Sequence, residues 1–536
     1  MSERKIVVAN TAELKDGEMK EVSADGTPIL LTRLEGKYHA LGAHCPHYGA
    51  PLAEGVLSDG RIICPWHHAC FDAKTGRFEE PPAFDSLPRF DLSVENEKIL
   101  VTLPSEVPDR ATPKMAKRDL ADMRLFGILG GGASGYMAAQ TLREDGYTGR
   151  IVMVTRENQA PYDRPNLSKD YLSGNAEPEW MPLRSSDFFA ENDIEIMSST
   201  EALSVDPAEK TITFKDGSTL EYDSLLVATG GGPRTLPFLT DTYENVFLLR
   251  SFSDSDRIAA AAEKGRRAVV IGSSFIGMEA ASSLRARGCE VTITAPDEVP
   301  FERILGTEIG KLFQAIHEQN GVKFKLGTHT ESFEGNGKVD AVVLRNGDRL
   351  EADLVVIGIG VRPATAFLNG IDLHPDGGVI TDEYLCAADG VYAAGDIAHF
   401  PDHRTGEITR IEHWRTALQL GRTAAHNMAG KPTIFTAVPF FWTTQFDATL
   451  NYVGHVKNWD RVIIQGDIKR RDFLAYYIKD HRILAVAGMN RDRELAIWEE
   501  HIRQNRVPPP SHLSDGSADL SEVRANLPDQ FALSAL

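Results

Sequence analysis

Hydrophobic and polar residues alternate in two different ways along this chain. Residues 1–103 contain short segments rich in β-branched and aromatic residues, separated by Gly, Asp and Pro. The segments expected to be strands include Lys5–Ala9, Pro28–Leu34, Lys37–Leu41 and Ile99–Leu103. This pattern predicts an all-β domain at the N-terminus.

From Arg124 the pattern changes to apolar strands followed by Gly-rich turns and helical stretches, which is typical of α/β structure. The alternation occurs twice, near residues 124 and 268, and predicts two nucleotide-binding units. After about residue 431 the chain is richer in aromatic and β-branched residues (TIFTAVPFFWTTQF), which indicates an antiparallel α+β domain.

At 536 residues the chain is too long for a single core, and we expect several domains. The segment PSEVPDRATPKMAKR is polar and contains several prolines, so we expect a linker there. The tail from Arg506 is rich in Pro, Ser and Asp, and we expect it to be loosely ordered. The predicted divisions are an all-β domain (1–104), a linker (105–122), a first nucleotide-binding domain (123–238 and 366–430), a second nucleotide-binding domain (239–365), a C-terminal domain (431–510) and a tail (511–536).

The net charge of −20 argues against a non-specific nucleic-acid-binding protein, which needs a basic surface. No stretch approaches the roughly 18–20 apolar residues needed to cross a bilayer. The N-terminus MSERKIVVAN lacks the apolar region of a secretory signal. We therefore expect a cytoplasmic protein without a membrane span.

Two Cys/His pairs carry the first chemical signal. They are Cys45-Pro46-His47 and Cys64-Pro65-Trp66-His67, with 16 residues between them. Two Cys thiolates can hold one iron and two neutral His nitrogens the other, which is the ligand set of a Rieske [2Fe–2S] centre. The alternative is a structural zinc site, whose ligands usually pair as Cys-x₂₋₄-Cys and His-x₃₋₅-His. The spacing favours the Rieske centre.

The surroundings of these pairs refine the prediction. The segments CPHYGAPLAEG and CPWHHACFDAKTG resemble both loops of Rieske ferredoxins. Respiratory Rieske proteins carry a further cysteine in each loop, where this chain has Ala50 and Trp66, so the resemblance is to the ferredoxin and oxygenase type. Cys70 is expected to be a small buried residue, and His44 and His68 to be structural or surface groups. Electrons are expected to leave from the imidazole side of the cluster.

The first nucleotide-binding motif begins after an apolar strand, Leu125–Leu129. Its Gly130, Gly132, Ala133, Ser134 and Gly135 fit a tight turn and a helix N-terminus that allow a pyrophosphate to approach the backbone. The next predicted strand, Arg150–Val154, ends near Glu157, whose carboxylate can bind an adenosine ribose.

The second motif, Ala268–Gly277, is less regular, because Ser274 replaces the middle glycine between Gly272 and Gly277. After the following strand, Glu290–Thr294, the usual ribose-binding acid is replaced by Ala295, and Asp297 is the nearest substitute. No arginine follows that strand directly, so NADH is favoured over NADPH.

Three further segments resemble a specific family. They are Pro161–Lys169, which includes Arg164 and Lys169; the loop Ala228-Thr229-Gly230; and Val391–Asp396, which includes Gly395 and Asp396. They resemble FAD-contacting segments of oxygenase-linked ferredoxin reductases and of apoptosis-inducing-factor-like proteins. With the Rieske domain in front, the chain resembles the Rieske-containing apoptosis-inducing-factor-like branch. The resemblance implies an all-β Rieske domain, then a glutathione-reductase-like α/β flavoprotein with two Rossmann units and an α+β C-terminal domain.

The same resemblance implies roles for three residues. Lys169 and Glu279 are expected to form an ion pair beside flavin N5, with a purely structural buried pair as the alternative. Trp414 is expected to lie at the flavin ring, either on an electron route or as a cover. Phe441 and Trp442 are expected to wall the same pocket or to belong to the aromatic core.

These observations predict an FAD-dependent NAD(P)H oxidoreductase that passes electrons from NADH through FAD to its own [2Fe–2S] cluster. An external acceptor protein is expected next, with an oxygenase component as the first candidate and a homodimer left open. The alternatives are a self-contained NADH oxidase, quinone or monodehydroascorbate-type reductase, and a redox-sensing interaction protein. No Cys-x₄-Cys pair follows the first nucleotide motif, so the dithiol chemistry of disulfide reductases is excluded.

Overall fold

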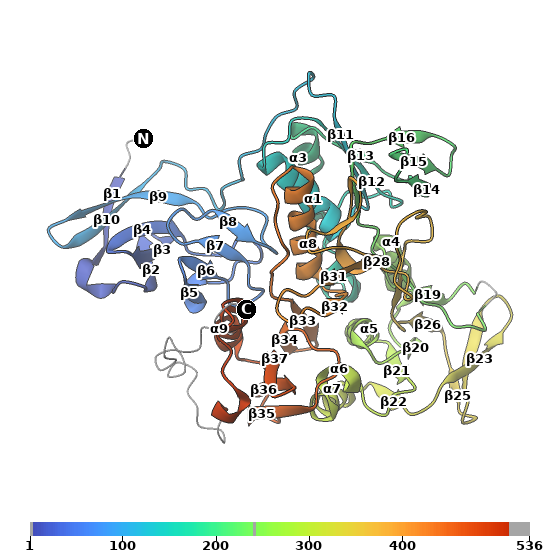
Figure 1. Ribbon diagram of the computed structural model, residues 1–536. Coiled ribbons are helices and arrows are strands. Elements are labelled where there is room, and N and C mark those ends of the chain that lie inside the picture. The colour runs from blue at the N-terminus through green and yellow to red at the C-terminus, as the bar shows by residue number, and fades with distance from the viewer. Residues whose placement is uncertain (1–3, 240–242, 514–536) are drawn as a thin grey trace.

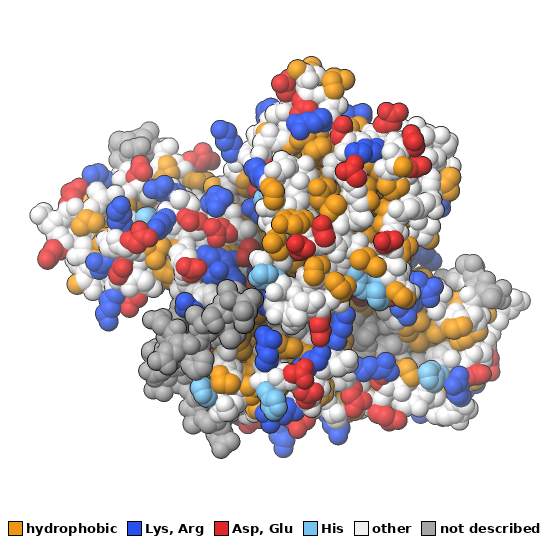
Figure 2. Space-filling view, viewed as in Figure 1, with side chains coloured by type: hydrophobic (Ala, Val, Ile, Leu, Met, Phe, Trp, Pro, Cys, Tyr) orange, Lys and Arg blue, Asp and Glu red, His pale blue; other side chains and the backbone are white. Residues whose placement is uncertain are grey.

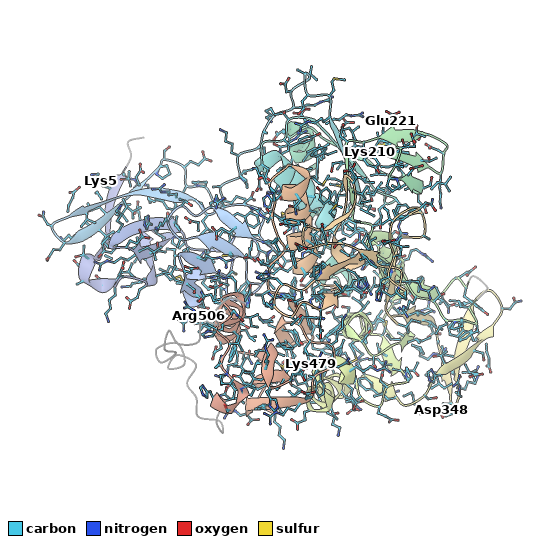
Figure 3. All side chains as sticks on the ribbon, viewed as in Figure 1. Lys5, Lys210, Glu221, Asp348, Lys479 and Arg506 are labelled. Carbon is cyan, nitrogen blue, oxygen red and sulfur yellow. The ribbon has the colours of Figure 1, made fainter. Side chains whose placement is uncertain are left out.

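The computed structural model describes residues 4–239 and 243–513. Figure 1 shows the N-terminal β domain on one side of the two α/β units, with the C-terminal domain below the first unit and beside the second. The labelled side chains in Figure 3 give the extent of this arrangement, because Lys5 lies in the N-terminal domain and Asp348 at the opposite end of the molecule. The predicted multidomain fold class, all-β followed by α/β and then α+β, is confirmed.

The N-terminal domain contains two antiparallel sheets. The larger has the order β1-β10-β9-β4-β3-β2, and its strands are Arg4–Asn10, Lys98–Leu103, Arg89–Glu95, Lys37–Gly42, Thr27–Leu34 and Met19–Ala24. In β10 the side chains of Ile99, Val101 and Leu103 are buried in alternation with more exposed ones, as the two-residue period of a strand requires. The smaller sheet consists of β5 (Val56–Ser58), β6 (Arg61–Ile63), β7 (Cys70–Asp72) and β8 (Phe78–Glu80).

The first nucleotide-binding unit is built on a mostly parallel sheet of order β13-β12-β11-β17-β30-β29. The strands are Ile194–Met197, Arg150–Val154, Leu125–Leu129, Ser224–Val227, Val391–Ala393 and Cys386–Ala388. Helices α1 (Ala133–Glu144) and α8 (Trp414–Met428) pack closely, since a Cβ on Gly421 would lie 2.2 Å from the Ser134 carbonyl oxygen. The predicted second strand, Arg150–Val154, is confirmed to the residue.

The second unit repeats the arrangement with a parallel sheet of order β19-β26-β20-β21-β22. The strands are Val246–Leu248, Leu354–Ile357, Arg267–Ile271, Glu290–Thr294 and Lys323–Lys325. Its helices include α4 (Phe252–Ala261), α5 (Phe275–Ala286) and α7 (Thr307–Gln319). Each unit also carries a three-stranded antiparallel sheet: β14-β15-β16 (Ala202–Asp206, Thr211–Phe214, Thr219–Glu221) and β23-β24-β25 (Thr330–Gly335, Val339–Leu344, Arg349–Glu351).

The C-terminal domain is a five-stranded antiparallel sheet with one covering helix. Its order is β33-β34-β37-β36-β35, with strands Phe440–Gln445, Ala448–Gly454, Arg482–Met489, Asp472–Lys479 and Arg461–Asp467, followed by α9 (Asp492–Arg503). Val507 and Leu513 pack against the core around Trp498, so ordered packing extends further than the composition predicted. The rest of the tail, 514–536, lies outside the described residues.

The N-terminal domain is joined to both neighbours by buried polar contacts. Arg415 of α8 is fully buried, and it donates to the carbonyl oxygens of His68 and Pro81, each at 2.9 Å, and to Glu499 of α9 at 2.8 Å. Helix α9 packs on β5, as Figure 1 also shows. Arg184 pairs with Asp85 at 2.7 Å. The all-β domain is therefore docked against the α/β and C-terminal domains.

Figure 2 shows acidic and basic side chains interspersed over the face in view. Within residues 4–239 and 243–513, no helix is long and apolar enough to span a bilayer.

Candidate active site

A cavity of about 760 Å³ lies between the first unit, the second unit and the C-terminal domain. Its wall contains most of the residues predicted to bind the flavin: Gly130, Gly132, Ala133, Ser134, Glu157, Arg164, Lys169, Ala228, Thr229, Gly230, Glu279, Gly395, Asp396 and Trp414. These residues come from segments up to 284 positions apart (Gly130 to Trp414), so the fold gathers the predicted motifs at one site.

The glycine turn after β11 has the form needed for a pyrophosphate. Gly130 has φ +126°, and a Cβ there would lie 2.1 Å from the Ala228 carbonyl oxygen, while a Cβ on Gly135 would lie 1.9 Å from that of Gly130. These two glycines permit close packing of strand and helix. A Cβ on Gly132, at the N-cap of α1, would meet nothing within 4 Å, so its backbone borders open space in the cavity. The turn therefore fits FAD.

Acidic side chains at the cavity are held by arginines. Glu157 pairs with Arg164 at 2.8 Å. Burial raises the pKa of Glu157, but Arg164 and a hydrogen bond from Tyr162 outweigh burial and lower it. Asp396 pairs with Arg250 at 3.0 Å. Arg250 lies just after β19 and was not predicted, because no motif marks its position.

The predicted pair of Lys169 and Glu279 is present. The Lys169 Nζ atom lies 2.9 Å from Oε2 of Glu279, and the Glu279 side chain is almost fully buried. Ser168 donates to the same oxygen at 2.6 Å, and Thr443 donates to Oε1 at 2.7 Å. The contacts place a cation at the cavity wall with a fixed counter-ion.

The aromatic residues predicted for this pocket also reach it. Trp414 is the first residue of α8, and Phe441 and Trp442 come from β33; all three line the cavity. The Phe441 ring lies 4.6 Å from His413, whose pKa is lowered to about 3 by burial.

The second nucleotide motif forms the same kind of turn outside the cavity wall. Gly272 has φ +114°, a Cβ on Gly277 would lie 2.2 Å from the Gly272 carbonyl oxygen, and the Ser274 hydroxyl donates to Gly358 at 3.3 Å. Phe275 and Ile276, at the start of α5, do reach the cavity. Asp297 pairs at 2.8 Å with Arg303, so the fold brings an arginine to the predicted ribose-binding acid that the sequence order did not reveal.

The two Cys/His pairs lie on two loops of matching conformation. The same backbone hydrogen bonds close each loop, from Cys45 N–H to Ala50 and Gly49 N–H to Cys45 in one, and from Cys64 N–H to Ala69 and His68 N–H to Cys64 in the other. The fourth residue after each cysteine has positive φ, +80° at Gly49 and +58° at His68. This symmetry presents one thiol and one imidazole from each side.

The four side chains converge. The Cys45 and Cys64 thiols lie close enough for Cys64 to raise the pKa of Cys45, and the His47 and His67 ring centroids lie 5.0 Å apart. Burial lowers the pKa of His47 to about 3 and that of His67 as well, so both imidazoles are neutral, the form that binds iron. Two thiols and two neutral imidazoles match a Rieske [2Fe–2S] cluster.

The imidazoles, expected on the exit side of the cluster, are partly exposed and also have aromatic neighbours. His67 lies 4.5 Å from Trp442, and His47 stacks on Tyr48 at 4.0 Å. Tyr48 donates to Asp163, just before the predicted flavin-contacting residue Arg164. The imidazole side therefore faces the cavity, because the buried contacts of Arg415 and Arg184 hold the domain in this orientation.

Comparisons with known proteins agree with this geometry. Residues 4–91 match the Rieske [2Fe–2S] domain, residues 126–421 match the family described as pyridine nucleotide-disulphide oxidoreductase, and residues 440–524 match the reductase C-terminal domain. The chain belongs to the pyridine nucleotide-disulphide oxidoreductase family. It is an FAD-dependent oxidoreductase of the ferredoxin reductase type with a Rieske domain at its N-terminus.

Several relatives and one solved structure illustrate the family. Human apoptosis-inducing factor 3 is 40% identical over 90% of this chain and 82% of its own length. Putidaredoxin reductase from Pseudomonas putida is 32% identical over 74% of this chain and 96% of its own length. In the covalent putidaredoxin reductase–putidaredoxin complex, the matching chain aligns with TM-score 0.72 and 32% identity, covering 76% of this chain and 99% of that one.

Some site residues of the oxidoreductase had no signal in the sequence. Ser168, Thr443, Gln445 and Arg415 are ordinary polar residues whose partners lie more than 80 positions away, and only the fold brings them together. Ser168 lies beside the predicted Lys169, and Thr443 beside the predicted Trp442, so proximity to a motif was the available hint. The five cysteines are all free, and Cys70 is buried beside Arg61, as expected.

Proposed function

We propose that this oxidoreductase takes electrons from NADH through FAD to its own Rieske cluster, and from there to an external acceptor protein. The observation that carries the proposal is the position of Trp442. Its side chain lines the flavin cavity, and its ring lies 4.5 Å from that of the cluster ligand His67. A single side chain thus spans from the cavity to the cluster loops.

The cofactors supply the redox chemistry, because FAD accepts two electrons from NADH and releases them one at a time to an iron–sulfur cluster. The residues of the chain bind and orient. The Gly130–Gly135 turn and Glu157 would hold the adenosine half of FAD, and Asp396 with Arg250 its middle. Lys169 would face the reacting edge of the isoalloxazine ring, and Cys45, His47, Cys64 and His67 would hold the cluster.

The relatives support an external protein as the final acceptor. One of them is the ferredoxin–NAD⁺ reductase subunit of the benzene 1,2-dioxygenase system of Pseudomonas putida, which is 30% identical over 74% of this chain. Here the Rieske domain takes the place of a separate ferredoxin, and a fused domain has a high effective concentration at its partner surface. We therefore propose an oxygenase component as the acceptor and NADH as the preferred donor.

The test is an anaerobic titration of the purified holoprotein with NADH, followed by optical and EPR spectra. We expect flavin bleaching together with a reduced Rieske signal. A Cys45→Ser variant serves as the control, and it should keep the flavin bleaching and lose the EPR signal.

Flavin bleaching in the wild type with an oxidised, intact cluster would contradict transfer within the chain and would favour a self-contained reductase. The same titration with NADPH tests the cofactor preference, which matters because Arg303 lies beside Asp297.

A further inference from the structure

We propose that Thr443, Gln445 and His317 form a hydrogen-bonded chain that fixes Glu279, and through it Lys169, in the flavin cavity. None of these three residues lines the cavity, so they are positioning residues. The inference rests on the proposed function only in that FAD binds beside Lys169 and is reduced by NADH.

The hydrogen-bonded chain is continuous and joins three elements of two domains. Thr443 Oγ1 lies 2.7 Å from Oε1 of Glu279, Gln445 Nε2 lies 3.0 Å from Thr443 Oγ1, and His317 Nε2 lies 2.8 Å from Gln445 Oε1. Thr443 and Gln445 come from β33 of the C-terminal domain, while Glu279 and His317 come from α5 and α7 of the second unit. Thr443, Gln445 and His317 are each 0% exposed.

The chemistry of the groups fixes the direction of every hydrogen bond. An ionised Glu279 carboxylate only accepts, so the Thr443 hydroxyl must donate to it. The Thr443 oxygen then accepts from the Gln445 amide nitrogen, which turns the Gln445 oxygen toward His317. That oxygen also only accepts, so His317 must carry its proton on Nε2. All the donors in the chain therefore point toward Glu279.

The surroundings of His317 agree with this tautomer. Its ring packs edge-on against Phe446 at 4.9 Å and Phe324 at 6.1 Å, and burial lowers its pKa to about 4. The Nδ1 atom has no hydrogen-bond partner among residues 4–239 and 243–513. The hydrogen-bonded chain begins at His317, and it requires there a neutral ring with a donating Nε2 and an unpartnered Nδ1.

The consequence lies at Glu279. Ser168 and Lys169 donate to Oε2, and the chain supplies the donor to Oε1, so both oxygens of this buried carboxylate are satisfied. A buried anion with an unpaired oxygen is costly and tends to move or to take up a proton. Either change would release Lys169 from its fixed position in the cavity wall.

The first experiment compares Thr443→Val, which removes the donor at almost constant volume, with Thr443→Ser, which retains it. Thr444→Val is the matched control, because Thr444 is the next residue of β33 and its hydroxyl contacts Thr449 instead. We expect flavin bleaching by NADH to slow about tenfold in Thr443→Val, as for loss of a hydrogen bond to a charged group, and to be unchanged in the other two variants. Equal rates in all three variants would overturn the inference.

The second experiment needs no turnover and uses the wild-type protein. The ¹⁵N NMR spectrum of the histidine-labelled, FAD-loaded protein should show His317 as the neutral Nε2–H tautomer, assigned with a His317→Gln variant. A Nδ1–H tautomer or a protonated ring would overturn the proposed direction of the chain. Both readouts precede cluster reduction, so failure of electron transfer to the cluster would leave this inference standing.

Discussion

At the scale of single residues, the site depends on where a side chain is absent as much as on where one is present. Gly130 and Gly132 belong to the same turn but have different surroundings. A Cβ on Gly130 would lie 2.1 Å from a backbone oxygen at φ +126°, whereas a Cβ on Gly132 would meet open space at the cavity. The first glycine is therefore needed by the fold and the second by the ligand.

This difference predicts opposite outcomes for two small substitutions. Gly130→Ala should destabilise the apoprotein by about 1–3 kcal/mol or more, because of the strained backbone and the clash. Gly132→Ala should leave the stability of the apoprotein unchanged and weaken FAD binding at least about tenfold, since its methyl group would occupy the path of the pyrophosphate. Thermal unfolding of apoprotein and FAD titration measure the two effects. Unchanged FAD affinity in Gly132→Ala would show that the pyrophosphate does not lie at this turn.

The residue scale also shows what the sequence made predictable. The glycine turn and the Cys/His loops are local patterns, and each has the predicted conformation because contacts such as Gly135 on Gly130 and Gly49 N–H to Cys45 lie within a few residues. Arg250, which holds Asp396, and Thr443, which holds Glu279, had no comparable signal, because their partners are 146 and 164 positions away. The sequence therefore predicted the ligand-facing groups better than the groups that hold them.

At the scale of elements, strand β33 connects the two halves of the site. Successive side chains of a strand point to opposite faces. Trp442 is directed toward the cluster ligand His67. Thr443 and Gln445, which are two positions apart and share the opposite face, are directed toward Glu279 and His317. A register shift of one residue would exchange these faces and break both connections.

The position of Trp442 predicts a selective kinetic effect. Trp442→Leu should slow reduction of the cluster about tenfold or more, because the contact with His67 is lost and the geometry between the two centres loosens. Flavin bleaching by NADH should change less than about twofold. Stopped-flow absorbance and freeze-quench EPR separate the two steps.

Trp66→Leu provides the matched control, since Trp66 lies beside the same cluster ligand but is 39% exposed and is not part of the cavity wall. Equal slowing in both variants would indicate a general disturbance of the cluster loops. Unchanged cluster reduction in Trp442→Leu would contradict the route that we propose.

The hydrophobic period of a segment predicted whether it forms a strand or a helix, but it did not predict the distant element against which that segment packs. The alternating pattern identified β10, and the apolar runs identified β12 and β21 with their observed bounds. The docking of α9 on β5 brings together residues more than 430 positions apart and depends on shape and buried charge rather than on periodicity. For the same reason the sequence did not predict that His67 lies beside Trp442.

At the scale of the whole molecule, one buried ionic cluster ties three domains together. Arg415 of α8 pairs with Glu499 of α9 at 2.8 Å, and Glu499 also contacts His68, next to the cluster ligand His67. Arg415 is fully buried, and Glu499 is 5% exposed. Removing one partner of a buried ion pair leaves an uncompensated charge and is strongly destabilising.

The charge of Glu499 predicts how the stabilisation from its buried ion pair with Arg415 depends on pH. Burial raises its pKa, but Arg415 and His68 outweigh that effect and lower the pKa to about 2, compared with an ordinary value of 4.5. A group whose pKa is lowered on folding stabilises the protein above its unfolded value and loses that effect as the pH falls toward its folded value. Glu499→Gln should therefore cost about 3 kcal/mol of unfolding free energy at pH 7.

The difference in unfolding free energy between the wild type and Glu499→Gln should shrink as the pH is lowered from 4.5 toward 2, because the wild-type carboxyl group then becomes neutral too. Denaturant unfolding of the apoprotein at several pH values measures this free-energy difference without interference from the acid lability of an iron–sulfur cluster. Glu494→Gln on the same helix is the control, since its pair with Arg491 lies near the surface and should contribute less than about 1 kcal/mol at any pH. A constant difference across this pH range would show that Glu499 acts through packing, and the docking of the Rieske domain would then not depend on its charge.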